Sequence, residues 1–221
     1  MKTLESLAEL TELTCTDYKS IFRGVKDFDN HALIPKLGRL SLPEGDPLLW
    51  EKRLLWNFLN ESYPFREKGL NKWETLALAQ HYGLATRLLD WTQNPLVALY
   101  FGCAKDDIDG ALYVCSSTGN MIDPEKDDPF EIKEPFWIMP PHLDSRLIAQ
   151  KGLFSVQPNP SEPLIHPDMK KIRIPKELKS NFRSLIAKWG ITERTLFPGL
   201  QSIANDLNKG LTKHNRSNQP D

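Results

Sequence analysis

Residues 80–101 read QHYGLATRLLDWTQNPLVALYF, and the rest of the chain is organised around this stretch. It connects two strongly apolar segments that both have helical patterns. The short gap between them carries hydrogen-bonding side chains from His81, Tyr82, Thr86, Arg87, Asp90 and Thr92. Most connections lie at the surface and are built from small turn-forming residues. This connection instead mixes polar groups with leucine and tryptophan, so we expect it to be partly buried.

The stretch leaves two interpretations of Arg87 and Asp90 open. Buried charges need partners, and these two side chains can serve as each other's partner. The ion pair would then lock the connection. In the alternative, the connection borders a pocket in which Tyr82, Thr86 and Thr92 face a polar ligand.

The composition describes a folded protein of one domain. The chain has 221 residues, of which 40% are hydrophobic, and its formal net charge is −1. This charge gives no field that would attract nucleic acid or an anionic membrane, so stable nucleic-acid binding is not indicated. The three cysteines lack CxxC spacing, which argues against a disulfide framework or a zinc site. We expect no metal.

No secretory signal and no membrane-spanning segment is visible in the sequence. The cysteine usage fits a reducing compartment, and we expect a cytoplasmic protein without a membrane partner.

The hydrophobic patterns predict an α+β fold, a single domain with a small mixed or antiparallel sheet flanked by helices. Strands are expected over 18–25, 111–115, 136–139, 153–156 and 171–174. Helices are expected over 3–13, 46–59, 71–83, 94–101 and 175–190, several of them opened by Asp-Pro, Asn or Asn-Pro caps. The domain is expected to span 1–207, with 3–13 as a brace, followed by a disordered polar tail over 208–221.

Two further positions are candidates for a ligand site. Arg23 lies at the end of the first long strand, and the adjacent Gly24 allows another group to approach the backbone closely. Arg146 and Gln150 are four residues apart and share a face if 142–150 is helical. Gln150 lies just before a strand, which makes it a candidate to point into a cleft.

The chain lacks GxxxxGK[ST], HExxH, GxSxG and GxGxxG motifs. These absences argue against the common nucleotide hydrolases, metalloproteases and α/β-hydrolases.

Four blocks of sequence carry a resemblance to a known family. They are Phe22-Arg23-Gly24, the run from His81 to Phe101, the segment from Arg146 to Phe154, and the segment from Gly190 to Leu200. In order and spacing they resemble the FRG domain family, which is named after its Phe-Arg-Gly triplet and is found mostly in bacteria. The resemblance extends over nearly the whole chain. The arrangement of an Arg-Gly at a strand end, a polar loop before a helix and a later polar residue is similar to that of ADP-ribosyltransferases, an analogy of arrangement.

The resemblance implies roles for particular residues. Arg23 would hold the pyrophosphate or a ribose hydroxyl of NAD through its fork of donors. Tyr82 would stack on nicotinamide, and Thr86 or Thr92 would bind ribose. Gly24 and Arg87 complete the expected NAD-binding set.

The expected catalytic set is Arg23, Asp90, Gln150 and Glu193. A carboxylate near the ribose stabilises the positive charge that develops as the bond to nicotinamide loosens. Gln150 stands where those transferases usually have a glutamate, so Asp90 or Glu193 would have to supply this charge.

Two functions of different classes therefore remain open. One is an ADP-ribosyltransferase-like enzyme that uses NAD on an unidentified macromolecular acceptor, as a toxin or a phage-defence effector. The other is a non-catalytic module that uses the same pocket to sense a nucleotide-like ligand or to bind a protein. A nuclease is disfavoured, because no acidic metal cluster is evident.

Overall fold

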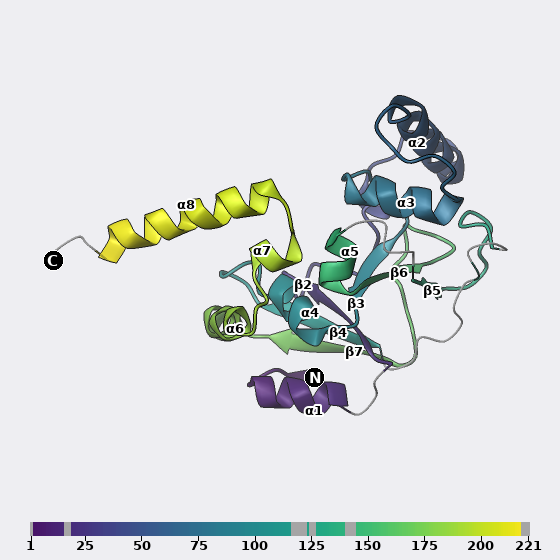
Figure 1. Ribbon diagram of the computed structural model, residues 1–221. Coiled ribbons are helices and arrows are strands. Elements are labelled where there is room, and N and C mark those ends of the chain that lie inside the picture. Colours follow the sequence, from purple (N-terminus) through teal and green to yellow (C-terminus); the bar gives the residue numbers. More distant parts are fainter. Residues whose placement is uncertain (1, 16–18, 116–122, 124–126, 140–144, 218–221) are drawn as a thin grey trace.

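The computed structural model describes residues 2–15, 19–115, 123, 127–139 and 145–217. One seven-stranded sheet has the order β1-β7-β4-β2-β3-β6-β5 (Figure 1). The strands are β1 (Lys2–Thr3), β2 (Ile21–Val25), β3 (Leu89–Thr92), β4 (Gly110–Cys115), β5 (Phe136–Ile138), β6 (Gly152–Val156) and β7 (Met169–Ile174). The β1–β7 pair is parallel and the other pairs are antiparallel, so the sheet is mixed. The predicted α+β fold is confirmed.

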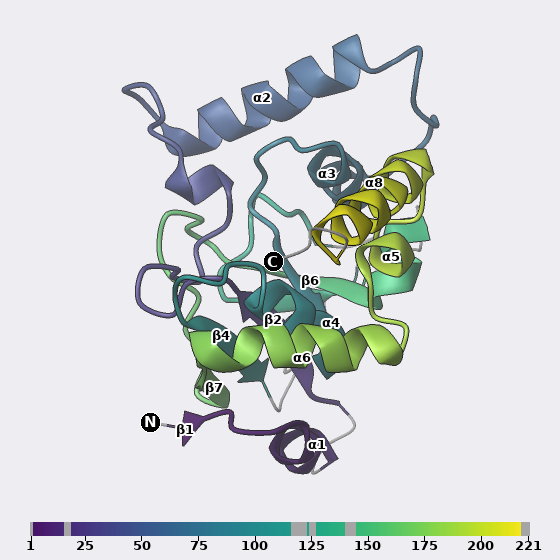
Figure 2. The same cartoon turned by 90° about the vertical axis from the view of Figure 1, so that its left-hand side faces the viewer.

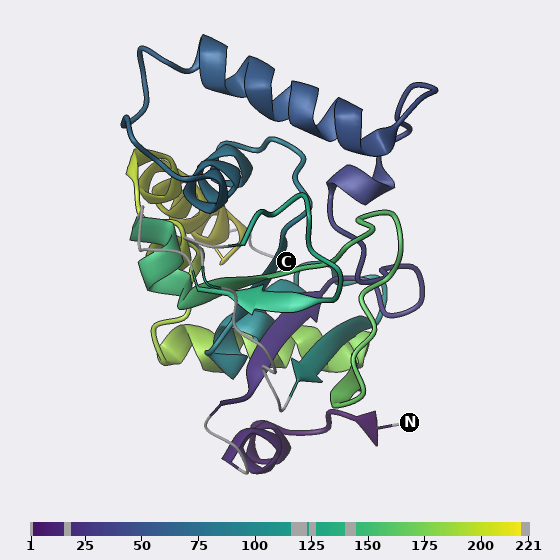
Figure 3. The ribbon, with the colours of Figure 1, turned by 90° about the vertical axis from the view of Figure 1, so that its right-hand side faces the viewer.

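Helices surround this sheet. They are α1 (Leu7–Cys15), the 3-10 turn η1 (Leu37–Arg39), α2 (Pro47–Glu61), α3 (Lys72–His81), α4 (Pro95–Gly102), α5 (Ser145–Gln150), α6 (Lys176–Lys188), α7 (Glu193–Leu196) and α8 (Leu200–Ser217). In Figure 2, α6 crosses in front of α4, and α1 lies near the β7 edge of the sheet. In Figure 3, α2 and α3 lie at the opposite end of the molecule from α1.

Both faces of the sheet are buried. Along β4, Leu112 and Val114 join one apolar cluster, while Ala111 and Tyr113 join another on the opposite face. This alternation follows from the two-residue period of a strand. The first cluster includes residues of α1, α4 and α6. A third cluster joins α2 and α3 to β5 and β6, so these two helices are anchored to that edge of the sheet.

Capping side chains define the starts of three predicted helices. Asp46 accepts a hydrogen bond from the amide of Leu48 at 2.9 Å and begins α2. Asn71 begins α3, where it forms a capping box with Glu74. Asn94 accepts from the amide of Leu96 and begins α4. Such caps satisfy amides that the first helical turn leaves without partners, and all three helix starts were predicted correctly.

Three segments differ from the sequence predictions. The predicted connection between two helices contains the strand β3, because Leu89–Thr92 pairs with β6 along its whole length. The short strand β1 precedes the first helix, which begins at Leu7 rather than at residue 3. The helix α8 runs through Ser217, into the segment 208–221 that was predicted to be a disordered tail, and in Figure 1 it projects away from the sheet.

Candidate functional site

A cavity opens where β2 and β3 separate. β2 pairs with β4 along its whole length, but it pairs with β3 only at Phe22 and Thr92. Beyond this pair the two strands are not hydrogen-bonded to each other. Arg23 and Gly24 of β2 and Asp90 of β3 line a cavity of about 300 Å³, hereafter the Arg23 cavity. The split therefore places polar side chains between two interior strands of the sheet.

Arg23 bridges the two separated strands. Its Nη1 donates to the backbone carbonyl of Asp90, an acceptor that the ladder between β2 and β3 leaves unpaired. The same nitrogen lies 3.7 Å from Oδ2 of Asp90. The Arg23 side chain is 13% exposed, whereas that of Asp90 is 67% exposed. The buried member of the pair is therefore Arg23, and Asp90 lies on the solvent side.

The charge of Arg23 is held in an unusual setting. Burial lowers the pKa of its guanidinium below the ordinary value, Asp90 opposes this shift, and the nearby Arg39 adds to it. Guanidinium is the most basic of the common side-chain groups, so the side chain stays charged at neutral pH. Its Nε is buried and has no hydrogen-bond partner among the described residues. This buried donor is therefore unsatisfied within the described structure.

The helix α3 contributes one face to the cavity. Ala77, Gln80 and His81 line it, and their spacing of three and four residues places them on one side of the helix. Gln80 donates from Nε2 to Oδ1 of Asp90 at 2.7 Å, and its Oε1 accepts from the hydroxyl of Thr86. The chain Thr86–Gln80–Asp90 thus fixes the orientation of the carboxylate.

The opposite wall comes from the second half of the chain. Arg146, Leu147 and Gln150 of α5 line the cavity together with Phe197, and Phe101 of α4 lies edge-on to Phe197 at a centroid distance of 6.0 Å. The guanidinium of Arg146 lies over the Phe197 ring at 4.8 Å. This wall offers aromatic surface with a cation beside it. Such a lining suits a planar ligand ring.

Two polar side chains in this region are partly committed to the protein. Thr92 donates its hydroxyl to the carbonyl of Gln150 at 2.6 Å and accepts from the amide of Asn94 at 2.9 Å. Gln150 donates from Nε2 to the carbonyl of Leu196 at 3.0 Å. These bonds fix α5 and the start of α4 against β3, and they position both side chains at the cavity.

The structure brings together only some of the predicted site residues. Arg23, Gly24, Asp90, Thr92 and Gln150 all line the Arg23 cavity. The other four predicted residues, Tyr82, Thr86, Arg87 and Glu193, are not among its lining residues.

Each of these four has another environment. Tyr82 ends α3 with its side chain 72% exposed, and Thr86 is buried behind Gln80. Glu193 begins α7 and accepts a hydrogen bond from Asn205 at 3.0 Å.

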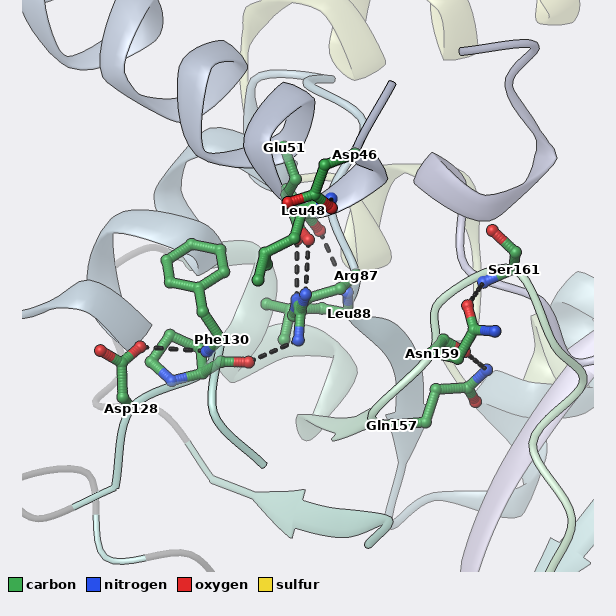
Figure 4. Close-up of polar contacts among 12 residues, drawn as sticks. Asp46, Leu48, Glu51, Arg87, Leu88, Asp128, Phe130, Gln157, Asn159 and Ser161 are labelled. Atoms are coloured by element: carbon green, nitrogen blue, oxygen red, sulfur yellow. Dashed lines mark hydrogen bonds and ion pairs between the residues drawn. The ribbon is translucent and has the colours of Figure 1, made fainter. Parts of the chain in front are cut away.

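The interpretation that pairs Arg87 with Asp90 is wrong. Arg87 instead forms two hydrogen bonds to Glu51 of α2, and its Nη1 donates to the carbonyl of Pro129 at 2.6 Å (Figure 4). Its guanidinium also lies 5.1 Å from the centre of the Phe130 ring. Asp90 instead accepts a hydrogen bond from Gln80 and lies 3.7 Å from Arg23. A partner 36 residues away could not be identified from the local sequence.

From the sequence, no site role was predicted for Gln80, Phe101 or Phe197. The signal for Gln80 was its helical spacing from Ala77, with His81 adjacent. No comparable signal marked the two phenylalanines, because residues of this type more often fill a core.

Two further observations concern the described part of the chain. No group of three or more His, Cys, Asp or Glu side chains there is placed to hold a metal ion. None of its helices has both the length and the apolarity needed to cross a bilayer.

Comparison with known proteins gives one family match. Residues 18–110 match the model of the FRG domain. No curated protein and no solved structure shows a significant match to the chain. The matched region runs from just before β2 to the first residue of β4, so it includes Arg23, Gln80 and Asp90, while α5 and Phe197 lie beyond it. Residues 18–110 therefore belong to the FRG domain family, and they contribute the Arg23–Asp90 side of the cavity.

Proposed function

We propose that the Arg23 cavity binds NAD and that the protein is an ADP-ribosyltransferase-type enzyme. The observation that carries this proposal is the pairing of Arg23 with Asp90 at a cavity that also has an aromatic wall. A buried guanidinium with an unpaired hydrogen-bond donor is suited to bind a phosphate oxygen or a ribose hydroxyl. The aromatic wall suits the nicotinamide ring.

Asp90 is the carboxylate available for the reaction among the residues that line the cavity. In the proposed step, the bond between ribose C1′ and the pyridinium nitrogen breaks, and its electron pair passes to that nitrogen. Nicotinamide then leaves as a neutral molecule. The nucleophile of the acceptor adds to C1′, and its proton passes to Asp90. A carboxylate held by Gln80 stabilises the positive charge on the ribose during this step.

Nicotinamide release from NAD tests the proposal. Arg23→Ala and Asp90→Asn should lose the release seen with wild type, while thermal melts show that both variants are folded. Arg183 and Asp106 provide matched controls, because Arg183 also donates to a backbone carbonyl, that of Cys103 at 2.6 Å, and pairs with Asp106 at 2.5 Å. Neither lines the cavity, so Arg183→Ala and Asp106→Asn should retain activity.

Absence of nicotinamide release by wild type, with no shift of the melt by NAD, would contradict the proposal. Because transfer needs an acceptor, the assay should be run with and without a bacterial lysate from which small molecules have been removed.

The proposal extends to a role as a toxin or phage-defence effector in bacteria, since ADP-ribosylation of an essential macromolecule stops growth. Induced expression of wild type, Arg23→Ala and Arg183→Ala in bacterial cells tests this extension. Growth arrest by wild type and Arg183→Ala alone would support it. Equal growth of all three strains would count against it.

A non-catalytic module is the second candidate, and one observation favours it. The cavity carries Gln150 where a second carboxylate would help catalysis, and the amide of Gln150 is bound to Leu196. This candidate is supported if NAD or ADP-ribose raises the melting temperature while nicotinamide release stays absent.

A further inference from the structure

A second hollow adjoins the Arg23 cavity and shares a wall with it. Its volume is about 250 Å³, and Arg23, Gln80 and Asp90 line both spaces. Lys36 and Arg39 line only the second space, hereafter the basic hollow. A group in the basic hollow therefore lies next to the same Arg23–Asp90 pair that borders the cavity.

The basic hollow carries an excess of positive charge. Three basic side chains and one carboxylate line it, which gives a formal charge of +2. Asp90 is partly engaged, since it accepts a hydrogen bond from Gln80 and lies 3.7 Å from Arg23. In the described chain, no carboxylate lies within ion-pair distance of Lys36 or Arg39. A concave surface with this charge attracts an anion.

Donors remain available on all three cations. The ammonium of Lys36 donates to the carbonyl of Gly83 at 2.6 Å, which uses one of its three protons. Nη1 of Arg39 lies 3.1 Å from Nε2 of His31, and Nε of Arg23 has no partner in the described structure. An anion with several acceptor oxygens could therefore bind more than one of these side chains at once.

The two cations that belong only to the basic hollow are held by a rigid turn. Lys36 and Arg39 are three residues apart, and residues at this spacing lie on the same side of a 3-10 turn such as η1. Leu37 between them is 1% exposed, and its amide donates to the carbonyl of Thr86 at 3.2 Å. The turn is thus fixed to the segment just before β3.

A neighbouring loop holds the turn from its other side. A Cβ added to Gly38 would lie 1.8 Å from the carbonyl oxygen of Pro160, so only glycine allows this approach. The loop is itself ordered by side chains: Gln157 donates to the carbonyl of Asn159, and Asn159 accepts from the amide of Ser161 (Figure 4). The geometry of the basic hollow is therefore built into the fold.

The neighbouring His31 lies close to the same positive charges, and its pKa is lowered. Burial, followed by the charges of Arg23 and Arg39, lowers the pKa of its imidazole to about 4. A cationic neighbourhood disfavours a further positive charge in this way. Burial makes the largest contribution to this shift, and the two guanidinium groups add to it.

We propose that the basic hollow binds the phosphates of the ligand whose remaining part occupies the Arg23 cavity. This inference rests on the proposed function and specifies where the pyrophosphate of an NAD-like ligand lies. The cavity alone, at about 300 Å³, is at the lower end of the range for small-molecule pockets. The basic hollow adds comparable space on the far side of Arg23. A ligand with a phosphate bridge between two nucleoside halves fits two adjoining spaces with cations at their shared wall.

Calorimetric titration with ADP-ribose and with inorganic pyrophosphate tests this assignment on the full chain. The variants are Lys36→Gln, Arg39→Gln and the double substitution. Arg53→Gln and Lys188→Gln are matched controls, because both are exposed cations outside the two spaces. Each single substitution in the basic hollow should weaken ADP-ribose binding by about tenfold or more, the usual effect of losing one hydrogen bond to a charged group. The controls should bind like wild type.

Two further results are expected. Pyrophosphate should compete with ADP-ribose for binding. The loss of affinity in the double variant should be larger at low salt than at high salt, because salt screens these charges.

Each contrary outcome has its own meaning. Equal ADP-ribose affinity in wild type and the double variant would overturn the assignment while nicotinamide release still supports the proposed function. Pyrophosphate that binds through Lys36 and Arg39 together with ADP-ribose, without competition, would overturn the single-ligand assignment and indicate phosphate from a separate molecule. Failure of wild type to bind ADP-ribose would overturn the assignment too, and the nicotinamide assay separately decides the proposed function.

Discussion

Arg87 and Glu51 form a bidentate ion pair inside the protein. Nε donates to Oε1 at 2.8 Å and Nη2 to Oε2 at 2.5 Å, and the two side chains are 2% and 3% exposed. The pair joins α2 to the segment that leads into β3. Since Arg87 also donates to Pro129, one guanidinium fixes three segments of the chain.

Glu51→Ala should strongly destabilise the fold. The substitution leaves the Arg87 charge buried without its partner, and such losses typically cost about 3–5 kcal/mol. Urea unfolding of wild type and variant measures the change. Asp106→Ala is the control, because its pairing with Arg183 is solvent-exposed and typically contributes at most about 1 kcal/mol. Equal effects of the two substitutions would contradict this account of the buried pair.

Gly24→Ala should destabilise the protein more than Gly102→Ala. A Cβ on Gly24 would lie 1.7 Å from the carbonyl oxygen of Ala98, so β2 and α4 would have to move apart. A Cβ on Gly102 would meet the end of the Ile174 side chain at 2.4 Å, and a side chain can rotate away. Overpacking costs about 1–3 kcal/mol and can exceed this where backbone must shift. Denaturant midpoints of both variants measure the order, and a reversed order would contradict it.

The sequence predicted some elements of the fold and missed others. Local signals sufficed for the three capped helices and for the strand Gly110–Cys115, but the expectation that Arg23 lies at the end of its strand was wrong, because β2 continues to Val25. The strand β3 was missed, because its partner β6 lies some 60 residues away in the sequence and the pairing leaves no local signal beyond three buried side chains. The ion pairs at the site also join residues that are far apart in the sequence. Arg87 pairs with Glu51, and Asp90 pairs with Arg23.

The pH dependence of stability should reflect His31. In the folded protein the pKa of its imidazole is lowered to about 4, whereas in the unfolded chain it is about 6.5. Between these values the unfolded state binds more protons, so the free energy of unfolding should fall as the pH drops from about 6.5 to 4. Below about 4 this contribution should level off. His31→Gln should reduce the difference between urea midpoints at pH 7 and pH 4.5.

An NMR titration of the His31 ring provides an independent measurement. The ring should remain neutral until the pH approaches 4. Pyrophosphate bound in the basic hollow would offset the charges of Arg23 and Arg39, and it should therefore raise the pKa of His31. A pKa of His31 near 6.5 in the free protein would contradict the effect expected from burial of the ring and from the charges of Arg23 and Arg39.

Thr92→Val should separate a positioning role of Thr92 from direct ligand binding. The hydroxyl of Thr92 is buried, donates to the carbonyl of Gln150 and accepts from the amide of Asn94. Valine has a similar shape but leaves both groups without this partner, which should lower the free energy of unfolding by about 1–3 kcal/mol. Thr92→Ser keeps the hydroxyl and should restore most of this loss. ADP-ribose affinity at a temperature where all three proteins are folded completes the test. If the hydroxyl only positions α5, the loss of affinity in Thr92→Val should follow its loss of stability, whereas a stable Thr92→Val with weak binding would show that the hydroxyl contacts the ligand.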